Sequence, residues 1–377
     1  MSQSPGLLLS VLAFALVIGP LIFLHELGHY FAGRSFGVKI DAFSIGFGNE
    51  VFGWTDKRGT RWKFSALPLG GYVKFAGDLN PASVPDPEWL ELPPEERART
   101  LQARPVWQRA IIVAAGPITN FIVAIIILAG FAMTFGVDRT PSVVGVVSPG
   151  SAAASIGLQT GDRITALDGR SIATFSDVFQ FAVLRPGAQV AVDFTHDGVT
   201  LRRNAVLGTA VERDRFGNEF KKGLLGIGPT TPVSEPVGLF EAPLVGVEMT
   251  GKILRTTLDG LGQIITGRRS VEELGGPLRI AKVSGEQLSL GWPDLIFLIA
   301  GISINLGFIN LLPVPLLDGG HLFFYAIEAI RRRPVPPQIQ EWAFRGGLAA
   351  ILALMVTVTI NDLGAFGLWK TLSGLIG

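Results

Sequence analysis

The chain has 377 residues, of which 48% are hydrophobic and only 17% are charged, and its mean hydropathy is +0.43. This composition is too apolar for an ordinary soluble enzyme and indicates a membrane protein, while the net charge of +1 gives no support to nucleic acid as a partner. Because the chain has no cysteine, disulfides and thiolate metal sites are excluded, and any transition metal must bind to histidines and carboxylates.

Three uncharged segments are long enough to cross a bilayer as helices: residues 2–24, 110–135 and 295–317. A helix rises about 1.5 Å per residue, and the hydrocarbon layer is about 30 Å thick. A shorter apolar segment between Arg345 and Asp362 spans only if flanking side chains reach the interface or the bilayer thins locally. The first segment lacks the basic start of a signal peptide, so we expect it to be retained. The sequence thus predicts a polytopic α-helical membrane protein with about four transmembrane helices.

The distribution of basic residues predicts the side of the membrane on which each loop lies. Lys and Arg gather after the first span and after the third, whereas the segment before the first span has neither. Cytoplasmic loops carry an excess of Lys and Arg, so both basic loops are predicted to be cytoplasmic. The two termini and the long segment from about residue 136 to residue 294 then lie on the outer side. In a bacterium this is an inner-membrane protein with periplasmic N- and C-termini.

The first span leads into a motif that is typical of zinc sites. His25, Glu26 and His29 form H-E-x-x-H, and residues four apart share one face of a helix, so both imidazoles can reach one metal ion. Glu26 is then placed beside the metal-bound water. Ionisable side chains at the end of a membrane helix are costly unless they serve a site. The pattern therefore favours a zinc site over an accidental match at a helix end.

Two short runs in the first cytoplasmic loop, residues 62–66 and 72–75, are predicted as extended strands on either side of a Pro-Leu-Gly-Gly sequence. Such strands could pair with an unwound substrate segment by strand addition. Gly70, Gly71 and Tyr72 are therefore candidate substrate-binding residues. An ordinary cytoplasmic hairpin is the alternative.

The outer segment divides into two parts. Residues 141–209 alternate short β-branched runs with Gly-rich turns, and the stretch PGSAAASIGLQTGD resembles a bacterial PDZ domain. Residues 222–293 include a long stretch that is apolar on one side but interrupted by charges, so an amphipathic surface helix is predicted rather than a span. The flanking parts are residues 1–136, with the first two spans and the cytoplasmic strands, and residues 294–377, with the last two spans.

The third predicted span is interrupted close to a carboxylate. Pro313 and Pro315 free backbone groups of the helix, which is tolerated inside a membrane only beside protein or a wet cavity. A catalytic zinc needs three protein ligands and one open position. Asp318 follows the break at about the depth of His25, because the two helices enter from the same side. Asp318 is the preferred third ligand, and His321 is the alternative.

These motifs closely resemble the site-2 protease family of intramembrane metalloproteases, in the branch of the bacterial regulator-of-sigma-E proteases. The resemblance implies that His25, His29 and Asp318 bind Zn²⁺, that Glu26 is the general base, and that Asn305 and Asn310 hold substrate near the metal. It covers nearly the whole chain, with SIGFG at 44–48, LPLGGYVKFAG at 67–77, AAGPITNF at 114–121, ELGGPLRIA at 273–281 and NLLPVPLLDGGH at 310–321.

The expected function is hydrolysis of peptide bonds in or near transmembrane segments, with Glu26 activating a zinc-bound water. The expected partners are single-span membrane proteins, such as anti-sigma factors or signal-peptide remnants, the lipid bilayer and peptide tails at the PDZ domain. That domain could exclude substrates or recruit them. Asn305 and Asn310 could instead be contacts between helices, a frequent role of asparagine in membranes.

Two other functions stay open. One is a membrane scaffold that uses its PDZ domain and has no catalysis. The other is a transporter with broken helices, which would need a second, similarly interrupted half that is not apparent.

Overall fold

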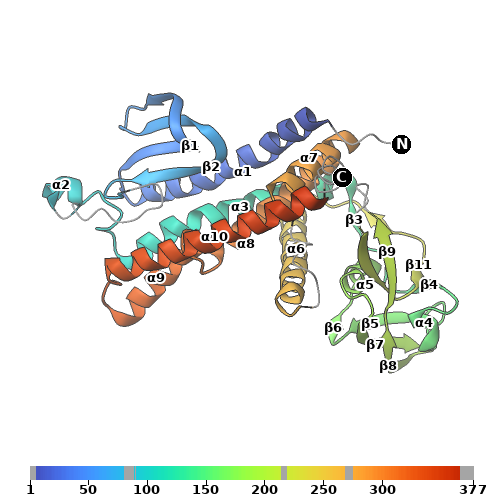
Figure 1. Ribbon diagram of the computed structural model, residues 1–377. Helices are drawn as coiled ribbons and strands as arrows, with labels where there is room; N and C mark the ends of the chain where they lie inside the picture. Colours follow the sequence, from blue (N-terminus) through green and yellow to red (C-terminus); the bar gives the residue numbers. More distant parts are fainter. Residues whose placement is uncertain (1–5, 80–88, 90, 214–218, 268–274, 366–377) are drawn as a thin grey trace, which may run out of the picture. The chain divides into compact units, whose positions relative to one another are not determined.

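The computed structural model describes residues 6–79, 89, 91–213, 219–267 and 275–365 (Figure 1). The chain divides into two compact units. The first, mainly helical, comprises residues 1–128, 246–257 and 270–364; the second, rich in strands, comprises residues 129–245, 258–269 and 365–377.

Four helices of the described part are long and apolar enough to cross a membrane, which confirms the predicted fold class. α8 ends before Pro313, earlier than the predicted residue 317, because the prolines that follow cannot donate helical hydrogen bonds. The fourth helix is longer than predicted and includes Asp362. The four helices are α1 (Leu7–Ser35), α3 (Val106–Phe135), α8 (Trp292–Leu311) and α10 (Pro337–Ala365).

Small residues let α3 and α8 approach closely. A Cβ atom on Gly307 would lie 3.0 Å from the carbonyl oxygen of Pro117. The Ser303 hydroxyl donates to the Asn120 carbonyl oxygen at 2.8 Å, and both side chains are fully buried. A buried apolar cluster continues the contact through Ala124, Leu128, Ala300 and Ile304. The crossing of these helices is therefore closely packed, as in other membrane bundles.

Further helices lie in the connections between the spans. α6 (Ala242–Ile265) includes the predicted amphipathic stretch, and α7 (Pro277–Leu290) packs along α1 and α8. α9 (Asp318–Arg331) begins after the proline break and leads toward α10. A short helix, α2 (Pro94–Arg97), lies in the first loop.

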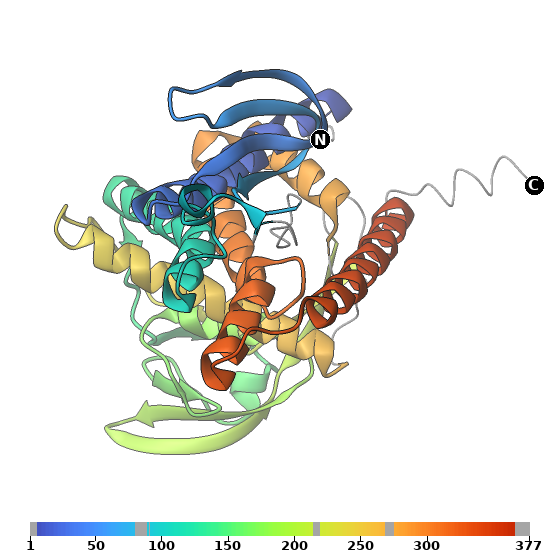
Figure 2. The ribbon, with the colours of Figure 1, turned by 90° about the vertical axis from the view of Figure 1, so that its left-hand side faces the viewer.

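The loop between α1 and α3 forms a bent sheet from β1 (Ile40–Thr55) and β2 (Arg61–Phe75), next to α1 (Figure 1 and Figure 2). Phe43 on β1 pairs with Trp62 on one side and with Val73 on the other. The predicted strands 62–66 and 72–75 therefore belong to one strand and are not partners in a hairpin, because β1 runs between them. Glycines allow the bend, since Gly46 has φ +91° and a Cβ there would lie 2.7 Å from the Leu67 carbonyl oxygen.

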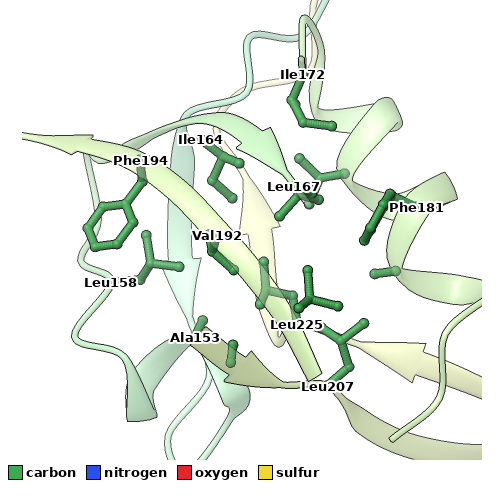
Figure 3. Packing of buried hydrophobic residues seen from close by; sticks show 14 of the residues in the cluster. Ala153, Leu158, Ile164, Leu167, Ile172, Phe181, Val192, Phe194, Leu207 and Leu225 are labelled. Atoms are coloured by element: carbon green, nitrogen blue, oxygen red, sulfur yellow. The ribbon is translucent and has the colours of Figure 1, made fainter. Parts of the chain in front are cut away.

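The second unit holds a small β-rich domain around one apolar core, which includes Ile164, Val192 and Phe194 (Figure 3). Its central sheet has the strand order β6-β5-β7-β8. A separate pair joins β4 to β11, so the domain uses residues beyond 209, where its end is predicted. These strands are β4 (Val144–Val147), β5 (Arg163–Leu167), β6 (Arg170–Ser171), β7 (Gln189–His196), β8 (Val199–Val206) and β11 (Ile227–Pro229).

The other elements of this unit are short. α4 and α5 pack on the sheet, and α5 begins at a capping box in which Thr174 and Asp177 each bond to the other's backbone amide. β9 and β10 form an antiparallel hairpin, and β3 pairs with β12 where the chain enters and leaves the domain. The bounds are α4 (Ala152–Ser155), α5 (Phe175–Val183), β3 (Val137–Asp138), β9 (Gly208–Arg213), β10 (Glu219–Leu224) and β12 (Ser234–Glu235).

Candidate metal centre

α1 presents both histidines of H-E-x-x-H on one face. The Nε2 atoms of His25 and His29 lie 3.2 Å apart, and each residue is 7% exposed. This arrangement follows from the helical period, which brings residues four apart together on the same side. Two imidazole nitrogens are thus held close together in a buried site.

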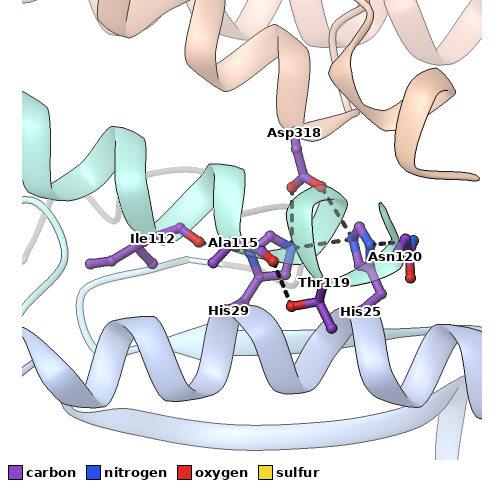
Figure 4. A network of polar contacts seen from close by, with 7 residues as sticks. All are labelled: His25, His29, Ile112, Ala115, Thr119, Asn120 and Asp318. Atoms are coloured by element: carbon purple, nitrogen blue, oxygen red, sulfur yellow. Dashed lines mark hydrogen bonds and ion pairs between the residues drawn. The ribbon is translucent and has the colours of Figure 1, made fainter. Parts of the chain in front are cut away.

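Asp318, the first residue of α9, faces the two histidines (Figure 4). One carboxylate oxygen lies 3.1 Å from the His25 Nε2 atom, and the other lies 3.4 Å from the His29 Nε2 atom. The two glycines that follow are essential to this placement: a Cβ on Gly320 would lie 2.5 Å from the Val314 carbonyl oxygen. A Cβ on Gly319 would collide with the backbone at Leu312. The Asp-Gly-Gly sequence therefore allows α9 to start tightly against the loop before it.

The donor set and its dimensions fit zinc. His25, His29 and Asp318 each offer one ligand atom, all within 4.8 Å of one another, and no other such group occurs in the described part of the chain. The closest separations between these side chains are 3.1, 3.2 and 3.4 Å. A tetrahedral zinc with bonds of about 2.0–2.1 Å places its ligand atoms about 3.3 Å apart. Three protein ligands also leave the fourth position open, as in catalytic sites.

α3 passes directly beside the histidines. The Nδ1 atom of His29 lies 2.9 Å from the Ile112 carbonyl oxygen, and the Nδ1 atom of His25 lies 3.0 Å from the side-chain amide of Asn120. Gly116 leaves no room for a side chain, because a Cβ there would lie 2.8 Å from the His25 Nε2 atom and closer still to His29. The close contact of Gly116 with the histidines could not be predicted from the sequence.

Glu26 is anchored by the sheet of β1 and β2. Its carboxylate accepts a hydrogen bond from the backbone of Val73 on β2, and the residue is 9% exposed. A Cβ on Gly71 would lie 3.1 Å from the Glu26 Cγ atom, so the glycine permits this close approach. The contact between β2 and Glu26 could not be predicted from the sequence.

A cavity of about 610 Å³ contains these side chains. It brings His25, Glu26, His29 and Asp318 together with four other residues of the predicted site: Asn310, Gly70, Gly71 and Tyr72. Asn305 is not in its lining; its Oδ1 atom accepts a hydrogen bond from Thr257 on α6 at 2.9 Å. His321 lines the cavity, and its ring packs on Phe344 with 5.1 Å between centroids.

The sequence profile of Peptidase family M50 matches residues 13–354. The metalloprotease MmpA of Caulobacter vibrioides is 37% identical to this chain, and the match covers 98% of the chain and 99% of MmpA. Two relatives with zinc-metalloprotease names are similar over comparable lengths. The one from Agrobacterium fabrum is 45% identical over 94% of this chain and 96% of its own length; the one from Rhizobium meliloti is 44% identical over 93% and 95%.

A solved PDZ domain of an SdrC-like protein from Listeria monocytogenes is also similar to part of the chain. It is 21% identical and covers 25% of this chain and 92% of that domain, with a TM-score of 0.20. A score of that size does not establish a shared fold.

Proposed function

This chain belongs to Peptidase family M50, the site-2 protease family, and from that membership we propose how its own residues perform the work of an intramembrane zinc metalloprotease. The observation that carries the proposal is the convergence of two histidines from α1 and one carboxylate from α9 on a single point. These residues are nearly three hundred positions apart in the sequence, so local structure alone cannot explain their contact.

His25, His29 and Asp318 hold the zinc ion. When bound, zinc acts as a Lewis acid toward water and toward the scissile carbonyl. The carboxylate offsets part of the metal charge in a buried site, where an uncompensated ion would be costly. The ring contacts to α3 orient the two imidazoles, as hydrogen bonds to the outer nitrogen do in other metal sites.

Glu26 moves the proton. Its carboxylate takes a proton from the attacking water and then delivers it to the leaving amine, so it is first a base and then an acid. The hydrogen bond from the Val73 backbone fixes the carboxylate on the β2 side of the cavity. A base that is held in place loses less entropy in the transition state than a freely rotating one.

The substrate segment lies along Gly70, Gly71 and Tyr72. A peptide bond inside an intact transmembrane helix is shielded, so the helix must unwind, and its freed backbone groups then need partners. Residues 71–75 pair with β1 on one edge, and the cavity lies at the same part of β2. Strand addition there presents an extended backbone to the metal, and the amide of Asn310, which also lines the cavity, is an additional hydrogen-bonding group for it.

We also propose the membrane in which the protein lies and the partners that it meets there. The protein lies in the bacterial inner membrane with its termini on the periplasmic side, as the basic loops favour. Its substrates are single-span membrane proteins, and the β-rich domain is a PDZ domain that meets their outer tails. The spans themselves follow from the four apolar helices.

The test compares Glu26→Gln with the wild-type protein. We expect the variant to keep stoichiometric zinc, because the ligands are untouched, and to cleave tagged single-span membrane proteins at least about 100-fold more slowly. Zinc content is measured on the purified protein and cleavage on co-expressed substrates. Rapid turnover by the variant would overturn the role of Glu26. Bound zinc with no cleavage of any substrate by the wild type would favour the scaffold instead.

A further inference from the structure

Asn120 is a buried polar side chain with an incomplete set of partners. It is fully buried on α3, and its amide nitrogen lies 3.0 Å from the Nδ1 atom of His25 (Figure 4). Its amide oxygen is buried and has no hydrogen-bond partner within the described ranges. A buried oxygen without a partner costs roughly 1–3 kcal/mol, which favours the amide orientation in which this oxygen meets a donor.

The chemistry of His25 determines what Asn120 must do. The Nε2 atom of His25 faces His29 and Asp318, so it is the atom that binds the metal and must carry no proton. The ring proton then lies on Nδ1, which becomes a donor and needs an acceptor. The carboxamide of Asn120 is the group at hydrogen-bond distance, and its nitrogen and oxygen differ only by a flip of the amide.

His29 shows the same arrangement with a backbone partner. Its Nδ1 atom lies 2.9 Å from the Ile112 carbonyl oxygen, which can only accept. α3 therefore supplies one acceptor for each imidazole: a carbonyl for His29 and the carboxamide oxygen for His25. Only the second depends on a side chain and can be changed by substitution.

Asn120 is held in place by the helices around it. The Ser303 hydroxyl on α8 donates to the backbone carbonyl oxygen of Asn120 at 2.8 Å. On the α1 side, a Cβ on Gly28 would lie 2.5 Å from the Ala115 carbonyl oxygen, so α1 and α3 are in backbone contact. The backbone of α3 at Asn120 is therefore closely packed against both neighbouring helices.

We propose that Asn120 is a positioning residue whose carboxamide oxygen accepts the Nδ1–H of His25 and so keeps the Nε2 atom free to bind zinc. The inference rests on the proposed ligand set. It assigns to Asn120 a role in metal affinity that is separate from its place in the helix crossing.

The experiment uses the full-length protein in detergent and measures zinc release to a competing chelator. Asn120→Leu removes the acceptor, and we expect metal affinity to fall about 10- to 100-fold, the usual loss when such a partner of a ligand is removed. Asn120→Asp keeps an acceptor of the same size and should retain the wild-type affinity or exceed it. Cobalt-loaded protein gives a second readout, since loss of the hydrogen bond should shift the visible absorption bands in the Leu variant only.

Ser303→Ala is the matched control. It removes a buried hydrogen bond from the same helix crossing without touching His25, so it should lower thermal stability and leave metal affinity unchanged. Equal zinc loss in Ser303→Ala and Asn120→Leu would show that packing alone is responsible and would overturn the proposal. Asn120→Ala replaces the Leu variant if that protein does not reach the membrane.

His25→Ala separates this inference from the proposed function. Wild-type zinc affinity in Asn120→Leu, with zinc lost in His25→Ala, would refute the role of Asn120 and leave the ligand set intact. Zinc retained in His25→Ala would refute the ligand set and, with it, the inference.

Discussion

Asp318 reaches the histidines through a sharp turn after α8. Pro313 and Pro315 cannot continue a helix, and Leu316 adopts φ +80°, a left-handed conformation that costs a residue with a side chain roughly 1–2 kcal/mol. The proline break could be predicted from the sequence. The strained leucine could not, because glycine or asparagine normally occupies that conformation.

The two asparagines of α8 illustrate a second limit of sequence reasoning. Asn305 and Asn310 are five residues apart, and at 3.6 residues per turn they point roughly 140° away from each other. The two side chains therefore cannot both face the same cavity. Asn310 lines it, whereas Asn305 bonds to Thr257.

The choice of third ligand is testable by substitution. Asp318→Asn should lose most of its zinc during purification, because a neutral amide is a poorer ligand than a carboxylate. His321→Ala should keep its zinc and lose about 0.5–1.5 kcal/mol of stability, since its ring packs on Phe344. The zinc-to-protein ratio and the thermal unfolding of both variants show whether Asp318 or His321 is the third ligand. Zinc lost from His321→Ala and kept in Asp318→Asn would reverse the assignment.

At the scale of elements, Asp362 connects α10 to α7. Its carboxylate accepts hydrogen bonds from the backbone amides of Gly276 at 3.2 Å and Arg279 at 3.1 Å, at the start of α7. A Cβ on Gly276 would lie 2.7 Å from this carboxylate, so a larger residue there would displace the cap. In the sequence, Asp362 marks the end of an apolar segment; its role as a cap depends on a helix 86 residues earlier in the chain.

Removing this cap should destabilise the helical part. We expect Asp362→Ala to lower the free energy of unfolding by about 1–2 kcal/mol, because the backbone amides of Gly276 and Arg279 lose their acceptor. Thermal unfolding in detergent measures the loss. Glu341→Ala is the control on the same helix: it removes an exposed pair with Arg345 and should cost only about 0.3–0.5 kcal/mol. Equal effects of the two substitutions would contradict the capping role.

The β-rich domain contains an ion pair that responds to pH. The Nδ1 atom of His196 on β7 lies 2.7 Å from the carboxylate of buried Asp162, and this hydrogen bond raises the pKa of His196 above its usual value. Because the folded pKa is the higher one, the pair stabilises the domain fully below about pH 6.5 and less as pH rises through the folded pKa.

A histidine titration followed by NMR on the labelled protein tests this ion pair. We expect the His196 signal, assigned by its loss in His196→Gln, to titrate above about pH 6.5, and Asp162→Asn to return it toward that value. An unchanged midpoint in Asp162→Asn would show that the carboxylate does not set the pKa.

At the scale of the whole molecule, the β-rich domain is an insertion whose two ends are tied together. β3 pairs with β12, and the Arg139 amide donates to the Val233 carbonyl oxygen at 2.8 Å. Arg139 also forms ion pairs with Glu235 and Glu241. The insertion between the second and third spans could be predicted from the alternating patterns. Its extent could not, because β4 pairs with a strand far along the chain and neither strand carries a local sign of the other.

The tied ends define a clean excision. Residues 141–231 can be replaced by a short Gly-Ser linker, because Arg139 and Val233 are already in backbone contact. Removing only residues 141–209 would leave β11 without its partner β4 and expose apolar surface. The same excision in a Glu26→Gln background is the control that assigns any cleavage to the metal centre.

We predict that the domain excludes substrates whose outer portion is bulky. The domain follows α3 along the chain, and the basic loops favour an outer location for it. There it would share the outer face with any folded domain of a substrate, and a steric barrier requires no binding energy. Recruitment by strand addition is modest in energy and selects weakly by itself. The excised protein should therefore cleave untrimmed single-span substrates that the full-length protein leaves intact, and should still cleave trimmed ones. If a folded, zinc-containing excision variant instead fails to cleave trimmed substrates, the domain recruits them, and the barrier must lie elsewhere in the chain.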